Sequence, residues 1–112
     1  MKTLTVKQPY ASLIVEGIKD IENRTWPTKY RGRVLIHAGL DRRLDPDFNK
    51  EQHNALYKYY NGIGTQRKVY GAIIGSVKIV DCVIKHPSIW AEKSKQIKDK
   101  AGNIVHCFKI YN

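Results

Sequence analysis

Long apolar runs, cysteines and acidic residues are all scarce in this chain of 112 residues. No apolar stretch approaches the roughly 20 residues that a helix needs to cross a bilayer, so we expect no membrane span. The first seven residues include lysine and lack the apolar stretch of a signal peptide, so we expect a cytoplasmic protein. Only two cysteines are present, Cys82 and Cys107, and in that compartment we expect both to remain thiols.

Acidic residues number 10 against 20 lysines and arginines, which gives a formal net charge of +10 and a sequence pI near 9.7. The excess is uneven, because residues 1–56 carry 10 basic and 7 acidic side chains while residues 57–112 carry 10 and 3. Such a charge favours a polyanionic partner, and RNA first among them. Lysines that only keep a small domain solvated would give the same composition, so charge alone leaves both interpretations open.

Nothing in the sequence divides the chain or marks it for cofactor chemistry. Its length is that of one domain, and its 42% apolar and 27% charged residues are ordinary for a globular protein. We therefore predict a single domain over residues 1–112. A zinc site would draw on Cys82, His86, His106 and Cys107, but the last two are adjacent in a predicted strand and point to opposite faces. We predict no metal and no cofactor, and no glycine-rich phosphate loop is present.

The first half of the chain predicts a strand, a helix and two further strands. Pro9 suits the first turn of a helix, Tyr10, Leu13 and Ile14 follow at helical spacing, and Gly17 stands where a left-handed cap belongs. The four elements cover residues 4–6, 9–16, 19–26 and 33–38.

The second half predicts a helix, a long strand, a short helix and a final strand. Asp45 precedes a proline, as at a helix N-terminus, and Asn61-Gly62 ends that helix. Gly71 and Gly75 interrupt the long β-rich run and mark bends by which a strand curls round a small barrel. The four elements cover residues 45–60, 69–84, 88–97 and 103–111. The fold class is α+β, a small curled sheet with two or three flanking helices.

The densest cluster of polar residues lies between residues 16 and 26. Glu22 and Arg24, two apart on a strand, share a face, and Lys19 at the preceding turn can lean over it. These side chains can hold a small polar ligand by charge-assisted hydrogen bonds, with the rings of Tyr10 and Trp26 on either side. An exposed strand with alternating charges would show the same pattern, so the sequence alone leaves both interpretations open.

Several blocks of sequence, in order, resemble the ASCH domain family of PUA-like proteins. The block from Val6 to Trp26 contains the pattern Gly-x-Lys-x-x-Glu-x-Arg, which begins at Gly17. The later blocks are Tyr30–Gly32 with Ile36–Gly39, Gly71–Gly75 with Val80–Cys82, and Ser88–Ala91. The pattern alone is moderately specific, whereas the ordered set, which spans about residues 4–91, is strong.

The resemblance implies a small β-barrel with flanking helices and a cleft beside the first helix. Lys19, Glu22 and Arg24 would line that cleft. Two further residues, Arg31 and His37, lie in the later matching blocks, although a lone strand histidine is more often structural. The expected binding residues are Gln8, Pro9, Tyr10, Lys19, Glu22, Arg24, Trp26, Arg31 and His37.

Three alternative functions stay open, and the resemblance implies the first two. Family members are thought to bind RNA or nucleotide-like ligands, which makes RNA or a nucleotide-like small molecule the expected partner. One branch hydrolyses N4-acetylcytidine with a Lys, a Thr and a Glu, and another is described as cutting RNA. A hydrolase would use Lys19 and Glu22 as catalytic residues, although Glu22 stands at the position of that branch's threonine. Beside Glu22 a lysine should keep its charge, unless Arg24 takes up the carboxylate.

A protein-interaction domain is the third alternative, with the tyrosine-rich second helix as its surface. Tyr57, Tyr59 and Tyr60 supply those rings, although helical spacing is also typical of core and rim residues. Many ASCH relatives continue past the last strand, whereas this sequence stops at Asn112. A homo-oligomer, in which a partner subunit supplies one wall of the cleft, is therefore also an expectation.

Overall fold

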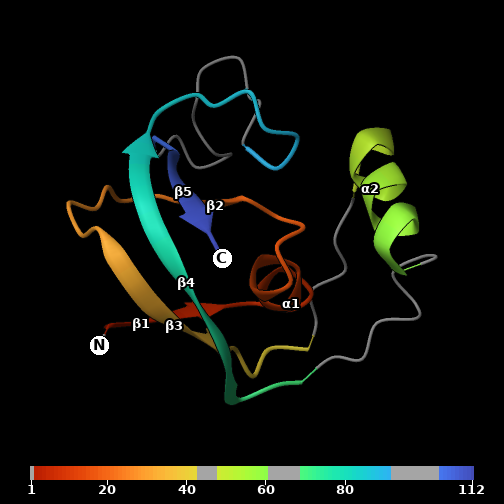
Figure 1. The fold of residues 1–112 in the computed structure, drawn as a ribbon, viewed down its shortest axis with the longest axis horizontal. Helices are drawn as coiled ribbons and strands as arrows, with labels where there is room; N and C mark the ends of the chain where they lie inside the picture. The colour runs from red at the N-terminus through yellow and green to blue at the C-terminus, as the bar shows by residue number, and fades with distance from the viewer. Residues whose placement is uncertain (1, 43–47, 61–68, 92–103) are drawn as a thin grey trace.

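The computed structural model describes residues 2–42, 48–60, 69–91 and 104–112, which form a curled sheet and two helices (Figure 1). No helix in these ranges is long and apolar enough to cross a membrane. The elements are β1 (Lys2–Val6), α1 (Tyr10–Val15), β2 (Ile21–Arg24), β3 (Gly32–Ala38), α2 (Lys50–Tyr60), β4 (Ala72–Val83) and β5 (His106–Tyr111).

The five strands form one mixed sheet in the order β1-β3-β4-β5-β2. The β1–β3 pair is parallel and the other three pairs are antiparallel. This agrees with the predicted α+β class and the curled sheet, with β1 and β2 as the two edge strands. Closure of the sheet into a barrel remains a prediction, because no strand pairing between β1 and β2 joins the described residues.

Two irregularities bend β4, the middle strand. The register with β3 shifts between Ile36 and His37, where β4 has one extra residue, Ile74, beside Gly75. A second shift occurs against β5 between Ile79 and Asp81. An extra residue in one strand increases local twist, and this confirms the predicted bend at Gly75. Gly75 has a further reason to lack a side chain, since a Cβ there would lie 2.6 Å from Cγ1 of Val15 in α1.

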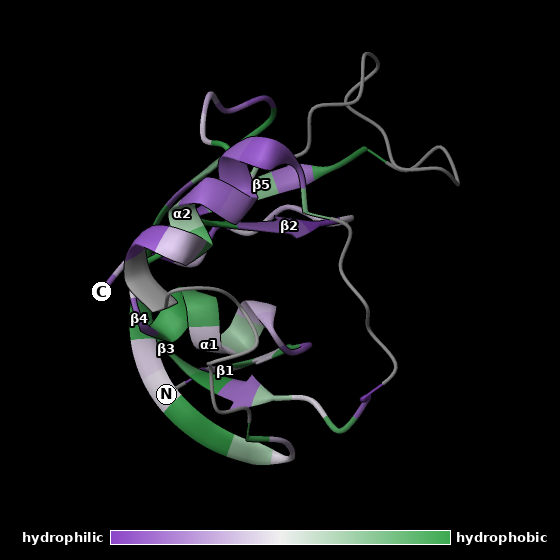
Figure 2. Ribbon diagram, turned by 90° about the vertical axis from the view of Figure 1, so that its right-hand side faces the viewer, coloured by the Kyte–Doolittle hydropathy of each residue, from purple (hydrophilic) through white to green (hydrophobic). Residues whose placement is uncertain are grey.

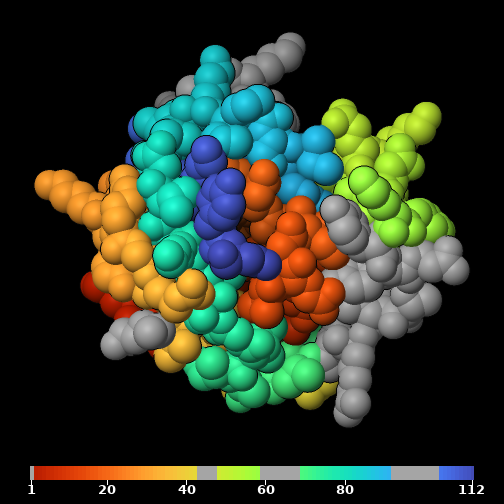
Figure 3. Space-filling view, viewed as in Figure 1, coloured from red at the N-terminus to blue at the C-terminus, as the bar shows by residue number. Residues whose placement is uncertain are grey.

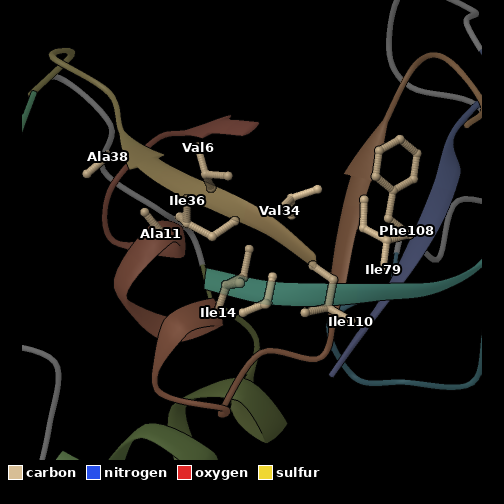
Figure 4. Packing of buried hydrophobic residues seen from close by; sticks show 10 residues of the cluster. Val6, Ala11, Ile14, Val34, Ile36, Ala38, Ile79, Phe108 and Ile110 are labelled. Atoms are coloured by element: carbon tan, nitrogen blue, oxygen red, sulfur yellow. The ribbon is translucent and has the colours of Figure 1, made fainter. Parts of the chain in front are cut away.

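The main apolar core lies on the concave side of the sheet, against α1. Ile14 of α1 packs there with inward-pointing residues of the strands, such as Ile36, Ile79 and Phe108 (Figure 4). Alternate residues of a strand point to one face, which is why β3 buries Val34, Ile36 and Ala38 and exposes more of the residues between them. The concave side of the sheet is therefore filled by one short, largely hydrophobic helix (Figure 2).

A second apolar cluster joins the helices to the outer side of β5 and β2. Phe48 packs edge-on against Trp90, with ring centroids 5.8 Å apart. Leu56 anchors α2 there, and the rest of α2 is largely hydrophilic (Figure 2). Cys107 and Phe108 are both buried because they face the second and the main cluster respectively. The cluster consists of Leu13, Ile21, Phe48, Leu56, Trp90, Ala91 and Cys107.

Two helix predictions need correction or lie partly outside the described residues. The second helix begins at Lys50 and not at Asp45, because Asn49 and Gln52 form a reciprocal cap. The Gln52 N–H donates to Asn49 Oδ1 at 2.9 Å, and the Asn49 N–H donates to Gln52 Oε1 at 3.0 Å. Asp45 itself lies outside the described residues. Of the predicted helix 88–97, residues 88–91 form a turn, and residues 92–97 lie outside the described part.

Candidate functional site

A left-handed cap at the end of α1 directs the chain into the site. Gly17 has a φ of +81°, its N–H donates to the Ile14 carbonyl at 3.1 Å, and the Ile18 N–H donates to the Leu13 carbonyl at 3.0 Å. This is the paired bonding of a Schellman motif, which glycine favours because a side chain strains a positive φ. The Lys19 N–H also donates to the Leu13 carbonyl, at 3.1 Å. The motif therefore fixes the position at which Lys19 leaves the helix. It confirms the left-handed cap predicted at Gly17.

Lys19, Glu22 and Arg24 form one connected charge cluster, which we call the charge triad. Lys19 Nζ lies 3.3 Å from Glu22 Oε1 and also donates to the Ile21 carbonyl. Arg24 binds the other carboxylate oxygen, with Nε at 2.9 Å and Nη2 at 2.7 Å from Glu22 Oε2. Glu22 thus bridges two cations, and Glu22 and Arg24 share a strand face as their spacing predicts.

The triad is largely shielded from water. Lys19 is 4% exposed and Glu22 is 7% exposed. Burial lowers the pKa of Lys19, against the opposing effect of the Glu22 carboxylate. Glu22 is expected from the sequence to keep Lys19 charged, but burial outweighs its effect on the pKa of Lys19. Arg24 also binds the Glu22 carboxylate, which is the exception that the sequence left open. Burial, and secondarily the charge of Glu22, raises the pKa of Tyr10, whose ring lies 5.3 Å from Lys19 Nζ.

Arg24 also links the two edge strands. Its Nη2 donates to the backbone carbonyl of Thr5 in β1 at 2.6 Å, so a side chain bridges strands that no backbone pair joins. We call this boundary between β1 and β2 the seam. The Arg24 guanidinium carbon lies 5.2 Å from the centre of the Trp26 ring, and Trp26 is 50% exposed. The seam thus presents a fixed cation beside an accessible aromatic ring.

A cleft of about 780 Å³ opens at the seam, within the size range of small-molecule sites. Its lining includes the charge triad, the end of β1, the start of α2 and the turn at residues 89–91. The aromatic rings of Tyr10, Trp26, Phe48 and Trp90 are among the lining side chains. Its described charged side chains are Lys7, Lys19 and Arg24 against Glu22, so the cleft carries a net positive charge.

The structure brings together five of the nine residues expected to bind a ligand. Those that line the cleft are Tyr10, Lys19, Glu22, Arg24 and Trp26. Gln8 is buried beside it and serves the fold, since its Nε2 donates to Ser12 Oγ at 2.8 Å and to the Val69 carbonyl at 2.9 Å. Pro9 is also buried, as the residue that precedes α1.

Arg31 and His37 lie away from the cleft lining. Arg31 Nη1 donates to the carbonyls of Thr28 and Tyr30, and its Nη2 lies 3.7 Å from Asp81 Oδ1. His37 lies on β3, and its Nδ1 is 3.3 Å from Oγ1 of Thr5 on the neighbouring strand β1. A role for either residue in binding would require a ligand that extends beyond the cleft.

Sequence reasoning missed the residues that reach the cleft from beyond β3. Phe48 and Gln52 enter from the start of α2, and Trp90 enters from the turn after β4. Gln52 Nε2 donates to the Ile89 carbonyl at 2.8 Å, and Asn23 Nδ2 donates to the Trp90 carbonyl at 2.9 Å, which fixes that turn against both elements. The only local signal was the Ser88–Ala91 block, which carries Trp90 but gives no partner in space.

The other candidate sites in the sequence are a metal centre, the two cysteines and the tyrosine-rich helix surface. Among the described residues, no group of three or more His, Cys, Asp or Glu side chains could hold a metal ion. Cys82 and Cys107 are not in a disulfide. Tyr57 of α2 is 62% exposed, whereas the side chains of Tyr59 and Tyr60 lie outside the described part. A protein-binding role for the tyrosine-rich helix stays a prediction.

Comparison with known proteins places the chain in a family. The family model of the ASCH domain matches residues 4–110. The chain is also 35% identical over 83 residues to human activating signal cointegrator 1 and 36% identical over 83 residues to its mouse counterpart. These matches cover 71% of this chain but 14% of each relative, so the chain spans about one seventh of their length. The chain belongs to the ASCH domain family.

Proposed function

We propose that the cleft at the seam binds RNA, or a nucleoside-like part of it, as a non-catalytic module. The observation that carries this proposal is the guanidinium of Arg24, which Glu22 and the Thr5 carbonyl hold 5.2 Å from the half-exposed ring of Trp26. A fixed cation beside an open aromatic face suits a nucleotide, whose phosphate is anionic and whose base stacks. Membership of the ASCH family supports an RNA-binding domain of the PUA-like kind at the family level.

The electrostatics of the charge triad favour a phosphate group of low charge. Glu22 cancels one of the two cations in the triad, so the triad as a whole matches about one negative charge when Lys19 is protonated. A phosphodiester within an RNA strand carries one such charge, whereas a nucleoside triphosphate carries several. The proposal therefore favours an internal nucleotide of a strand over a free nucleotide with a polyphosphate tail.

Fluorescence anisotropy with labelled single-stranded RNA tests this proposal. Trp26→Ala should weaken binding by about 5- to 150-fold, because stacking on an aromatic ring is worth ~1–3 kcal/mol per base. Tyr57→Ala is the matched control, since Tyr57 is an exposed ring that does not line the cleft. The affinity should also fall with salt, with about 0.7 added to the log–log slope for each phosphate neutralised. Absence of binding at low salt, or equal effects of the two variants, would refute the proposal.

A hydrolase is the second candidate, favoured by the lowered pKa of Lys19. A neutral amine can act as a base or nucleophile, and in that role Lys19 would promote hydrolysis of the amide of N4-acetylcytidine to cytidine and acetate. The wild-type rate is measured first, and then that of Lys19→Met. Rapid turnover that Lys19→Met abolishes, while the fold survives, would replace the non-catalytic proposal. Turnover no faster than the uncatalysed reaction would rule out the hydrolase proposal.

A further inference from the structure

The outer face of the sheet carries a row of side chains outside the cleft. Arg33 of β3 pairs directly with Lys78 of β4, and Lys78 pairs directly with Tyr111 of β5. Residues paired in this way point to the same face, and the face here is the outer one, because their neighbours Val34, Val77 and Ile110 are in the core. Figure 3 shows the three strands side by side, with β5 in blue next to β4.

The row unites two cations and an exposed ring. Opposed residues of an antiparallel pair have Cβ atoms about 4.5–5.5 Å apart. The cationic groups of Arg33 and Lys78 can therefore both contact the same anionic group of a ligand. Arg33 is oriented by Ser76, whose Oγ accepts from Nη1 at 3.0 Å. Tyr111 is 65% exposed, and neither Arg33 nor Lys78 has an acidic partner within 4.0 Å among the described residues.

This pairing has a cost for the free protein. Like charges directly opposite each other in a sheet are destabilising, and no described carboxylate relieves Arg33 and Lys78. An anion seated between them would remove the repulsion. The phosphodiester of RNA fits best, because the neighbouring tyrosine offers a face for the adjacent base or sugar and the chain has a net charge of +10.

We infer that Arg33, Lys78 and Tyr111 form a second contact for RNA, in which the two cations bind one backbone phosphate and the ring packs on the neighbouring nucleoside. β4 is the middle strand of the sheet and the seam joins its two edges, so the row lies across the sheet from the cleft. One strand of RNA must pass around the domain to touch both. This inference rests on the proposed RNA binding and adds a second contact to it. If the second contact proves wrong, the proposed binding at the cleft still stands.

Charge reversal at Lys78 separates this contact from a general effect of charge. Lys78→Glu should weaken binding of a labelled 20-nucleotide RNA at least tenfold and lower the log–log salt slope by about 0.7, the value of one phosphate. Lys58→Glu makes the same change of charge at an exposed residue in the last turn of α2, which does not line the cleft, and should reduce affinity far less. Cytidine monophosphate is a single nucleotide and cannot span both the cleft and the row, so its affinity for the cleft should stay the same in Lys78→Glu.

Stability gives an independent readout with the opposite sign. Lys78→Glu places a carboxylate opposite Arg33, so the melting temperature should rise by about 1–5 °C while RNA affinity falls. Tyr111→Ala should weaken binding of the 20-nucleotide RNA more than Tyr57→Ala does. Equal loss of affinity in Lys78→Glu and Lys58→Glu would overturn the inference, and so would loss of cytidine monophosphate binding in Lys78→Glu. Retained RNA affinity with loss of binding to anionic lipid vesicles would assign the row to a membrane surface and overturn it as well.

Discussion

The two halves of the curled sheet solve the same packing problem in different ways. Across β3, β4 and β5, backbone hydrogen bonds join every neighbouring strand, and the inner face carries apolar residues such as Ile36, Val77 and Phe108. At the seam between β1 and β2 a side chain, Arg24, makes the link, and the inner face of β2 carries Glu22 instead of an apolar residue. Glu22 is paired with the buried Phe108 of β5, so the charged group occupies a core position.

This comparison shows how the domain combines a rigid frame with a polar site. Burial of a charge is costly unless it is paired and hydrogen-bonded, and each member of the triad has such partners. The apolar half supplies the stability that this arrangement needs, and the seam is where the backbone leaves room for a ligand. The seam should therefore respond to loss of one charge more strongly than the apolar half responds to loss of one methylene group.

Glu22→Ala should give the largest effect. It leaves Lys19 and Arg24 together without their carboxylate, and breaking a buried ion pair in this way costs about 3–5 kcal/mol of the free energy of unfolding. Ile36→Val, in the apolar half, should cost only ~0.5–1.5 kcal/mol. Urea denaturation measures both, and Glu16→Ala, at an exposed glutamate, is the charge-matched control. If Ile36→Val proved the more damaging change, the triad would not be the main polar support of the seam.

Gly17→Ala should come next. The φ of +81° is unfavourable for alanine by about 1–2 kcal/mol, and the new Cβ would lie 2.8 Å from Nδ2 of Asn112. Because Gly17 precedes Lys19 by two residues, RNA affinity should fall together with stability. Gly39→Ala is the control, since the nearest atom to a Cβ at Gly39 is 3.6 Å away and its φ is not positive. Equal melting temperatures for the two variants would show that the cap does not fix the seam.

Local spacing was sufficient to predict the triad, and long-range contacts were not predictable. The cap at Gly17 and the two-residue period of a strand place Lys19, Glu22 and Arg24 together, because all of them lie within eight residues. Phe48 and Trp90 reach the same cleft from residues far along the chain, through a second apolar cluster that no local pattern reveals. The same limit applies to Gln8, whose place near the motif concealed a structural role in binding the Val69 carbonyl.

The pH dependence of stability offers a smaller and more specific test. Because burial lowers the pKa of Lys19, the unfolded chain holds more protons than the folded one between that lowered value and 10.5. Stability of the wild type should therefore rise with pH in this window, by at most about 1.4 kcal/mol per pH unit, relative to Lys19→Met. Tyr10, with its raised pKa, acts in the opposite direction above its ordinary value of 10.0, so the comparison is made below that pH. Parallel stability curves from about pH 8 to 10 would contradict the effect of burial on Lys19.

Arg31→Gln should give the smallest effect and defines where the seam ends. Arg31 and Asp81 are both exposed, and their 3.7 Å ion pair is of a kind that contributes ~0–1 kcal/mol. Stability measured by urea denaturation should therefore change by less than about 0.5 kcal/mol, as for most surface positions. Affinity for cytidine monophosphate should be unchanged, because Arg31 does not line the cleft, whereas Trp26→Ala weakens it in the same assay. A loss of cytidine monophosphate binding in Arg31→Gln as large as that in Trp26→Ala would extend the binding site to the β2–β3 connection and blur the boundary between the seam and the apolar half.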